Sequence, residues 1–501
     1  MATRLKTVLQ QQHLQTHSAF CREYDKIAAT IDPDLVGSAP KRSQFHRWLS
    51  GEVKGLPYPH HCRILEKMLP GHTATELFEP EITGRDIDES STPGLNPAPS
   101  ISWMPPRIQH QSPAGGARPI DSRELFGDRL PYLRMPPGRF FSGPDIPTVV
   151  FPATVDHGRV VGTAPLDPLS ATALATPGRA LVVARAGAPD HPGHYVMDRR
   201  RARARLAAAA PDAPLVFPHA YLLDDFTLAL IWAVTSLDSA LLDDDADLAN
   251  TMGRMDPLDL DPYPDVGRDD SVELSPVSQM WVGSTVCARH IIRHTDTLTG
   301  TPQFWTREQR GEEASTWLLF THKYHYLKAT AQTQGERPTR AFCIPPDAVR
   351  ASATPERILL LLATALHEAM GITTVVCTEP EYTATPGFVL DRAHRALVAN
   401  WVNTDRIWHV EVTDDRPVLR EFDDAVGWAR TRTILPGRSP RHRLQALADY
   451  LDLDWSWLVH RATGLADSGV TGLCSPRSRL LSTAGLERAC AFVSDLATDD
   501  R

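Results

Sequence analysis

One short amphipathic stretch near the start of the chain, Ala39 to Gly51, constrains the fold more than any other segment. Phe45, Trp48 and Leu49 recur at the spacing that places three side chains on one face of a helix. Gly51 is suited to the position that directly follows a helix. The stretch therefore predicts a helix that packs through one face and leaves a polar, basic face for a partner.

The polar face has side chains suited to DNA. Arginine can bind guanine with two hydrogen bonds, and glutamine can bind adenine in the same way. We expect Gln44 and Arg47 to reach base edges, and Lys41 and Arg42 to contact mainly phosphates. The full set of candidate DNA-binding residues is Lys41, Arg42, Ser43, Gln44, His46 and Arg47.

Four more apolar stripes at helical spacing flank this segment and predict an all-α, five-helix domain over residues 1–80. They consist of Leu5, Val8 and Leu9; of Phe20, Tyr24, Ile27 and Ile31; of Cys62, Leu65 and Leu69 within 57–69; and of Leu77 with Phe78.

This order of helices resembles the lambda-repressor-like (XRE) helix-turn-helix family over about a sixth of the chain. The run Pro40 to Ser50, followed by Gly55-Leu-Pro-Tyr-Pro-His-His-Cys, is similar to a subgroup common in actinobacterial regulators. The stretch from Asp32 to Ala39 is longer than the tight turn usual in that family. The resemblance implies a head that binds double-stranded DNA. Because so small a head makes few base contacts, we expect a homodimer on a palindromic operator.

The charge distribution agrees with a DNA-binding head. The chain has a net charge of −9, yet residues 1–80 contain ten lysines and arginines against eight acidic residues. Five of the seven lysines lie in this segment. Since DNA binding depends on neutralising phosphates, we expect DNA contacts to be confined to the N-terminal domain.

Composition excludes several classes of protein. Seven cysteines, an odd number without framework spacing, argue against a secreted disulfide-rich protein. Met1 to Gln12 lacks the apolar core of a signal peptide. The segment Phe226 to Leu242 is apolar but short, and it contains Asp238, so we expect a buried core helix. These features predict a cytoplasmic, nucleoid-associated protein without a membrane span.

The predicted fold class is α+β multidomain: the N-terminal helix-turn-helix domain (1–80), a Pro-rich linker (81–145) and a large mixed α/β body. In the middle region (146–350), we expect strands at 148–151, 160–161 and 180–184, and helices at 199–210, 226–242, 279–295 and 308–330. The helix at 199–210 contains five arginines, which favours a solvated face over a second nucleic-acid patch. The acidic stretch 243–273 predicts a loop.

Residues 351–501 predict an α/β effector-like or oligomerisation region with C-terminal helices. We expect strands at 372–377, 387–390 and 407–412, and helices at 354–371, 393–400, 419–430, 444–460 and 480–496. This order of elements resembles the effector-like domain that follows the helix-turn-helix in many actinobacterial regulators.

A metal site is one hypothesis for the body. Cys287, His290 and His294 share one face of a predicted helix, and His322 and His325 lie on the next helix. If these two helices pair, zinc or iron has candidate ligands. The alternative interpretation, which we favour, is that Cys287 is simply buried and that the histidines align by chance among twenty.

Aromatic segments predict a ligand pocket in the body. Phe304-Trp305 and the pair Trp401 and Trp408 have the composition of a cavity lining, although they suit a core equally well. The candidate ligand-binding residues are Trp305, Arg307, Glu308, His322 and His409.

No catalytic motif emerges from the sequence. His367-Glu368 lacks the second histidine of a zinc-protease helix, because Gly371 occupies that position. The aspartates at 256, 259, 261 and 265 do not have EF-hand spacing. We therefore expect no enzymatic activity and no cofactor.

Taken together, the sequence predicts a sequence-specific, DNA-binding transcriptional regulator. Its body would sense a small molecule or a small protein partner, or would mediate oligomerisation. The alternatives are a metal-dependent sensor or enzyme localised to DNA by its head, and a protein-interaction scaffold.

Overall fold

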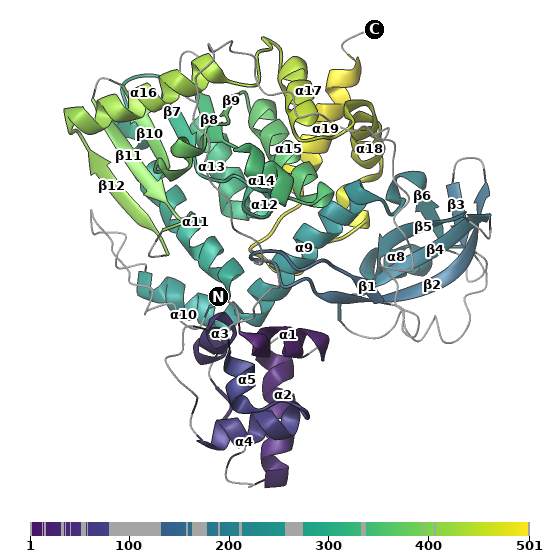
Figure 1. Ribbon diagram of the computed structural model, residues 1–501. Coiled ribbons are helices and arrows are strands. Elements are labelled where there is room, and N and C mark those ends of the chain that lie inside the picture. The colour runs from purple at the N-terminus through teal and green to yellow at the C-terminus, as the bar shows by residue number, and fades with distance from the viewer. Residues whose placement is uncertain are drawn as a thin grey trace, which may run out of the picture. The chain divides into compact units, whose positions relative to one another are not determined.

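The computed structural model of the chain divides into two compact units, residues 1–113 and 114–501, and each is described by itself (Figure 1). The structure describes residues 3–12, 14, 17–31, 35, 37–40, 42–51, 57, 59–79, 132–156, 159–162, 178–188, 191–209, 213–255, 274–331, 337–392, 394–404 and 407–498. The predicted boundaries at residues 80, 145 and 350 stay predictions.

The first unit contains five α-helices among its described residues, in agreement with the predicted helical domain. Its helices are α1 (Arg4–Gln11), α2 (His17–Ile31), α3 (Arg42–Ser50), α4 (Pro59–Met68) and α5 (Ala74–Phe78). The predicted apolar stripes meet in one core, where the rings of Phe20 and Phe45 lie 4.5 Å apart, centre to centre. Gly51 has a φ of 73°, the left-handed conformation expected directly after a helix.

The second unit contains two mixed β-sheets. The first sheet has the order β5-β4-β2-β3-β6, with β1 also paired to β2. Its strands are β1 (Tyr132–Arg134), β2 (Asp145–Asp156), β3 (Arg159–Gly162), β4 (Leu181–Ala188), β5 (His191–Asp198) and β6 (Val216–Pro218). Helix α8 (Arg199–Ala207) follows β5, and four of its five arginines lie outside the core, three of them exposed. That exposure agrees with a solvated face.

The second sheet has the order β12-β11-β10-β7-β8-β9, in which β7, β8 and β9 are parallel. Its strands are β7 (Gln303–Thr306), β8 (Thr339–Cys343), β9 (Thr373–Cys377), β10 (Phe388–Asp391), β11 (Arg395–Asn400) and β12 (His409–Thr413). Helix α16 (Arg416–Arg432) covers one face, and α11 (Pro276–His294) lies on the other (Figure 1). Both faces of the sheet are therefore buried.

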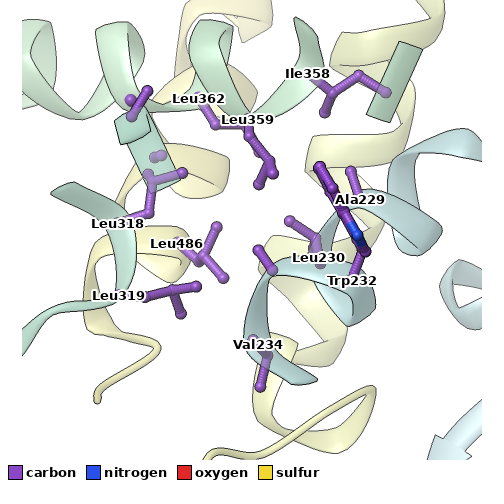
Figure 2. Packing of buried hydrophobic residues seen from close by; sticks show 14 of the residues in the cluster. Ala229, Leu230, Trp232, Val234, Leu318, Leu319, Ile358, Leu359, Leu362 and Leu486 are labelled. Carbon is purple, nitrogen blue, oxygen red and sulfur yellow. The ribbon is translucent and has the colours of Figure 1, made fainter. Parts of the chain in front are cut away.

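A helical core fills the second unit beside this sheet. Figure 2 shows side chains of α9 (Asp225–Asp243), α12 (Gly311–Leu319), α15 (Thr354–Ala369) and α19 (Ala484–Thr498) meeting there. The same apolar cluster contains residues from Leu133 to Leu496. Around it lie α10 (Asp245–Met255), α13 (Thr321–Ala331), α14 (Pro346–Ala351), α17 (Pro440–Tyr450) and α18 (Trp455–Ser468).

Helix α9 confirms the predicted core helix. By length and composition alone it is the one helix among the described residues that could cross a membrane, but 78% of its apolar stretch is buried inside the protein. Its N-cap, Asp224, accepts the backbone N–H of Thr227 at 3.1 Å, and the Thr227 hydroxyl accepts the Asp224 N–H at 3.0 Å.

The prediction of a helix at 393–400 was wrong, because residues 395–400 form strand β11 between β10 and β12. Ala396, Leu397 and Val398 are all buried, since helices cover both faces of this sheet. A strand buried on both faces lacks the alternation by which strands are recognised. The element order expected for an effector-like domain is changed accordingly.

Two predicted helices are each broken into two. The helix at 308–330 is α12 followed by α13, and Phe320 between them pairs in a β-bridge with Leu481. The helix at 444–460 is α17 followed by α18, with a turn that contains Asp452 at a φ of 55°. In the predicted loop 243–273, residues 245–255 form α10, and residues 256–273, with their four aspartates, lie outside the described residues.

Candidate functional site

The structure contains two candidate sites, one in each unit. The first is the outward face of helix α3. Two contacts to backbone carbonyls hold this helix and the segment before it: the Thr3 hydroxyl donates to Trp48 O at 2.7 Å, and His17 Nε2 lies 2.8 Å from Pro40 O. Phe45 and Trp48 are fully buried beneath the helix. Helix α3 is therefore held in a defined orientation within its unit.

The opposite side of α3 contains predicted DNA-binding residues. Arg47 is exposed and Gln44 is half-buried. Arg42, Ser43 and His46 also belong to α3, but their side chains lie outside the described residues, as does all of Lys41. The described part of this face thus presents one guanidinium and one amide, both of which can form paired hydrogen bonds with a base.

The second candidate site is a cavity of about 60 Å³ in the second unit. It lies between helices α11, α12 and α13 and the face of the second sheet that contains Phe304 and Arg340. Its walls are strongly aromatic, and its polar lining is mainly basic. Aromatic lining residues are Phe304, Trp305, Trp317, Tyr326, Phe388 and Trp401; charged ones are Arg307, Glu308, Lys323 and Arg340.

Lys323 and Glu308 form a buried ion pair at this cavity. Lys323 Nζ lies 2.7 Å from Glu308 Oε1 and donates a second bond, of 2.9 Å, to Thr316 Oγ1. The ammonium also lies 3.9 Å from the centre of a Trp317 ring and 4.4 Å from that of Trp401. Burial lowers the pKa of Lys323, and the Glu308 carboxylate opposes that shift. The charges of these two residues compensate each other.

Arg340 lies in the same cavity lining without such a partner. Its Nη1 donates to Thr306 Oγ1 at 2.9 Å, and its Nη2 to the Tyr326 hydroxyl at 3.4 Å. Its guanidinium carbon lies 4.4 Å from the Phe304 ring centre and 4.8 Å from that of Trp317. No described group accepts a hydrogen bond from Arg340 Nε or from Trp317 Nε1. Both donors are buried.

The cavity includes three of the five predicted ligand-binding residues. Trp305, Arg307 and Glu308 line it, although the Trp305 ring packs against Phe388 and Tyr382 on the other face of the sheet. His322 instead bonds to Ser284 Oγ at 2.9 Å, and burial lowers its pKa well below the usual value. His409 is exposed on β12, away from the lining.

Sequence reasoning missed the two most informative residues of the cavity. Arg340 lies in β8, a strand that was not predicted, and Lys323 belongs to the predicted helix that is broken in two. One signal was present: Lys323 is one of only two lysines after Lys67 in a chain that otherwise uses arginine. A rare residue type at a buried position is a reasonable marker of a specific role.

The proposed metal ligands do not come together. Helices α11 and α13 pack against each other, as the metal hypothesis required. However, no group of three or more His, Cys, Asp or Glu residues in the described part of the chain is placed to hold a metal ion. Cys287 lines the cavity, and burial raises the pKa of its thiol. His290 Nε2 lies 3.3 Å from Glu411 O, and its ring centre is 4.9 Å from that of His294.

Glu368, half of the incomplete zinc-protease motif, has a structural partner. Arg443 Nε donates to Glu368 Oε1 at 2.8 Å, and Nη2 donates to Oε2 at 2.5 Å. The pair links α17 to α15 in the interior of the second unit.

Comparison with protein-family models, with curated proteins and with solved structures found no match to this chain. The function is therefore proposed from the sequence and from the geometry of these two sites.

Proposed function

We propose that this protein is a sequence-specific, DNA-binding transcriptional regulator. The observation that supports this most directly is helix α3, which is anchored by Phe45 and Trp48 and has Arg47 exposed on another face. A rigid helix with a free guanidinium and a nearby amide suits the major groove, where both groups read base edges. The second unit would then supply dimerisation and a ligand cavity.

The charge distribution supports the same assignment. The excess of lysine and arginine over acid is confined to residues 1–80, and the remainder of the chain is strongly acidic. An acidic body is repelled by phosphates, which favours contact through the head alone. Two heads on one palindrome would supply the base contacts that a single short helix lacks.

The test begins with genome-wide mapping of DNA bound by the full chain, because this identifies the operator. Binding of the full chain to that operator, and to a scrambled duplex, is then measured by fluorescence anisotropy at several salt concentrations. We expect Gln44→Ala to lose about 1–3 kcal/mol on the operator and much less on scrambled DNA. Arg47→Ala should reduce operator affinity by a similar amount if it reads guanine.

A matched control is Arg350→Ala, which removes an exposed arginine of the second unit that pairs with Asp347. This variant should bind both duplexes as the wild type does. Equal losses on operator and scrambled DNA for Gln44→Ala would contradict base reading by α3. Mapping that finds no enriched sites would contradict the regulator proposal itself and favour a localised enzyme or a scaffold.

A further inference from the structure

We propose that the cavity between helices α11, α12 and α13 and the second sheet binds a small aliphatic monocarboxylate, whose carboxylate pairs with Arg340. The role of this ligand as a signal rests on the proposed function as a regulator. Binding of the carboxylate to the cavity does not depend on DNA and can be measured without it. The inference follows from an imbalance of charge, from unused hydrogen-bond donors and from the size and walls of the cavity.

The charge of Arg340 is not compensated within the described protein. Arg340 is only 3% exposed. Its guanidinium donates hydrogen bonds to the hydroxyl groups of Thr306 and Tyr326, and it forms no ion pair with a described carboxylate. The one lining carboxylate, Glu308, bonds to Lys323. The third lining cation, Arg307, is half-buried and is attracted by the Glu308 and Glu313 carboxylates, so Arg340 is the buried lining cation without a carboxylate. A buried cation is costly unless an anion pairs with it, so an anion is the expected occupant.

The unused hydrogen-bonding groups also require an acceptor. Arg340 and Trp317 both line the cavity, and no described group accepts a hydrogen bond from the Nε of the first or the Nε1 of the second. Arg307 Nε, at the end of β7, is a third donor of this kind. Since guanidinium and indole N–H groups cannot accept hydrogen bonds, a ligand that satisfies them must present lone pairs. A carboxylate provides two oxygens in the geometry that a guanidinium matches.

The walls and volume restrict the ligand to a small one. The rings of Phe304, Trp317 and Trp401 lie close to the charged groups, so atoms beyond the carboxylate meet aromatic surface. A water needs roughly 10–15 Å³ of such volume, so 60 Å³ has room for about four to six non-hydrogen atoms. That size corresponds to acetate, propionate or butyrate. Inorganic phosphate would fit by size but would gain nothing from the aromatic walls.

The experiment measures binding to the purified full chain without DNA. Acetate, propionate, butyrate and phosphate are titrated calorimetrically at constant ionic strength, and thermal unfolding is followed with each. We expect propionate or butyrate to bind best and to raise the melting temperature, because a ligand specific to the folded state stabilises it. Arg340→Met should weaken that binding more than about tenfold.

Two further variants test whether carboxylate binding depends on the guanidinium of Arg340 in particular. Arg350→Met is the matched control, because it replaces an exposed arginine that pairs with Asp347 outside the cavity lining, and it should leave carboxylate binding unchanged. Arg340→Lys keeps the charge but loses the planar fork, and its affinity should lie between those of the wild type and Arg340→Met. Should Arg340→Met not fold, Arg340→Lys supplies the comparison.

Several outcomes would overturn the proposal. They are the absence of carboxylate binding to the wild type, equal binding by the wild type and both Arg340 variants, and binding of phosphate alone. Because none of these measurements uses DNA, each leaves the operator experiment untouched. A carboxylate that binds but leaves operator affinity unchanged would support the site and remove only its signalling role.

Discussion

Two buried arginines in the second unit, Arg340 and Arg443, show how the same residue type can serve different purposes. They are 3% and 5% exposed. Arg443 forms two bonds to the Glu368 carboxylate and two more to the carbonyls of Gly437 and Arg438, at 3.1 and 2.7 Å. Arg340 has hydroxyl groups and aromatic rings around it instead.

We interpret this difference as one between a structural arginine, Arg443, and a ligand-binding arginine, Arg340. The charge of Arg443 is neutralised by Glu368, and this ion pair joins α17 to α15. Arg443 therefore holds two helices together. The region around Arg340 keeps a positive charge and unused donors beside a cavity. Burial alone does not distinguish a structural arginine from a binding one; the presence of a carboxylate from the chain itself does. The predictions below test this distinction, beginning with the largest effect.

Arg443→Met should destabilise the second unit most, by about 3–5 kcal/mol, because it leaves the buried Glu368 carboxylate without its cation. The shift of the urea unfolding midpoint of the full chain, followed by tryptophan fluorescence, measures the loss. Adding Glu368→Gln to this variant should recover part of the stability, since the unpaired charge is then removed. A loss below about 1 kcal/mol would contradict a structural role for the pair.

Buried histidines differ from buried arginines because an imidazole can lose its proton and remain neutral inside the protein. Burial lowers the pKa of His290 to about 4 and those of His322 and His367 well below the usual value. Between pH 4 and 6.5 the unfolded chain therefore binds more protons than the folded protein, so stability falls as the pH falls through this window.

For His290 alone, lowering the pKa from 6.5 to about 4 corresponds to a stability loss of at most about 3.5 kcal/mol, since each pKa unit is equivalent to about 1.4 kcal/mol. His290→Gln should lose less stability than the wild type between pH 7 and pH 4.5, as measured by urea unfolding at each pH. An identical pH dependence of the two proteins would show that His290 is not held neutral by the fold.

Arg340→Met should change the unfolding free energy of the ligand-free protein by less than about 1 kcal/mol. The variant loses two hydrogen bonds and contacts with aromatic rings, but it also removes a buried charge that has no carboxylate partner, and these effects oppose each other. The same urea experiment allows a direct comparison with Arg443→Met. Equal losses for the two variants would remove the distinction between the two regions.

The smallest effect is expected for Tyr326→Phe. The bond from Arg340 Nη2 to the Tyr326 hydroxyl is 3.4 Å long, which is outside the range of strong hydrogen bonds. We expect a change of about 0.5 kcal/mol or less in the unfolding free energy. A loss several times larger would mean that the hydroxyl, rather than a ligand, is the principal partner of the guanidinium.

The sequence by itself determined the parts of this protein that depend on local periodicity. The apolar stripes of residues 1–80 correctly predicted the helices of the first unit, and the apolar run 226–242 correctly predicted a core helix. Both patterns depend on side chains a few positions apart, so neighbouring residues are sufficient to specify them. Trp305, Arg307 and Glu308 were found because they are adjacent in the chain and include an aromatic residue beside charges.

Only the tertiary structure decided the remainder. Residues 395–400 form a strand because β10 and β12 pair with them, and the helix breaks near Phe320 and Asp452 depend on a bridge to Leu481 and on a left-handed turn. The cavity brings together α11, α12, α13, β8 and the end of β11, which are distant in sequence. Whether a buried arginine finds a carboxylate is settled by long-range packing, so no local pattern distinguishes Arg340 from Arg443.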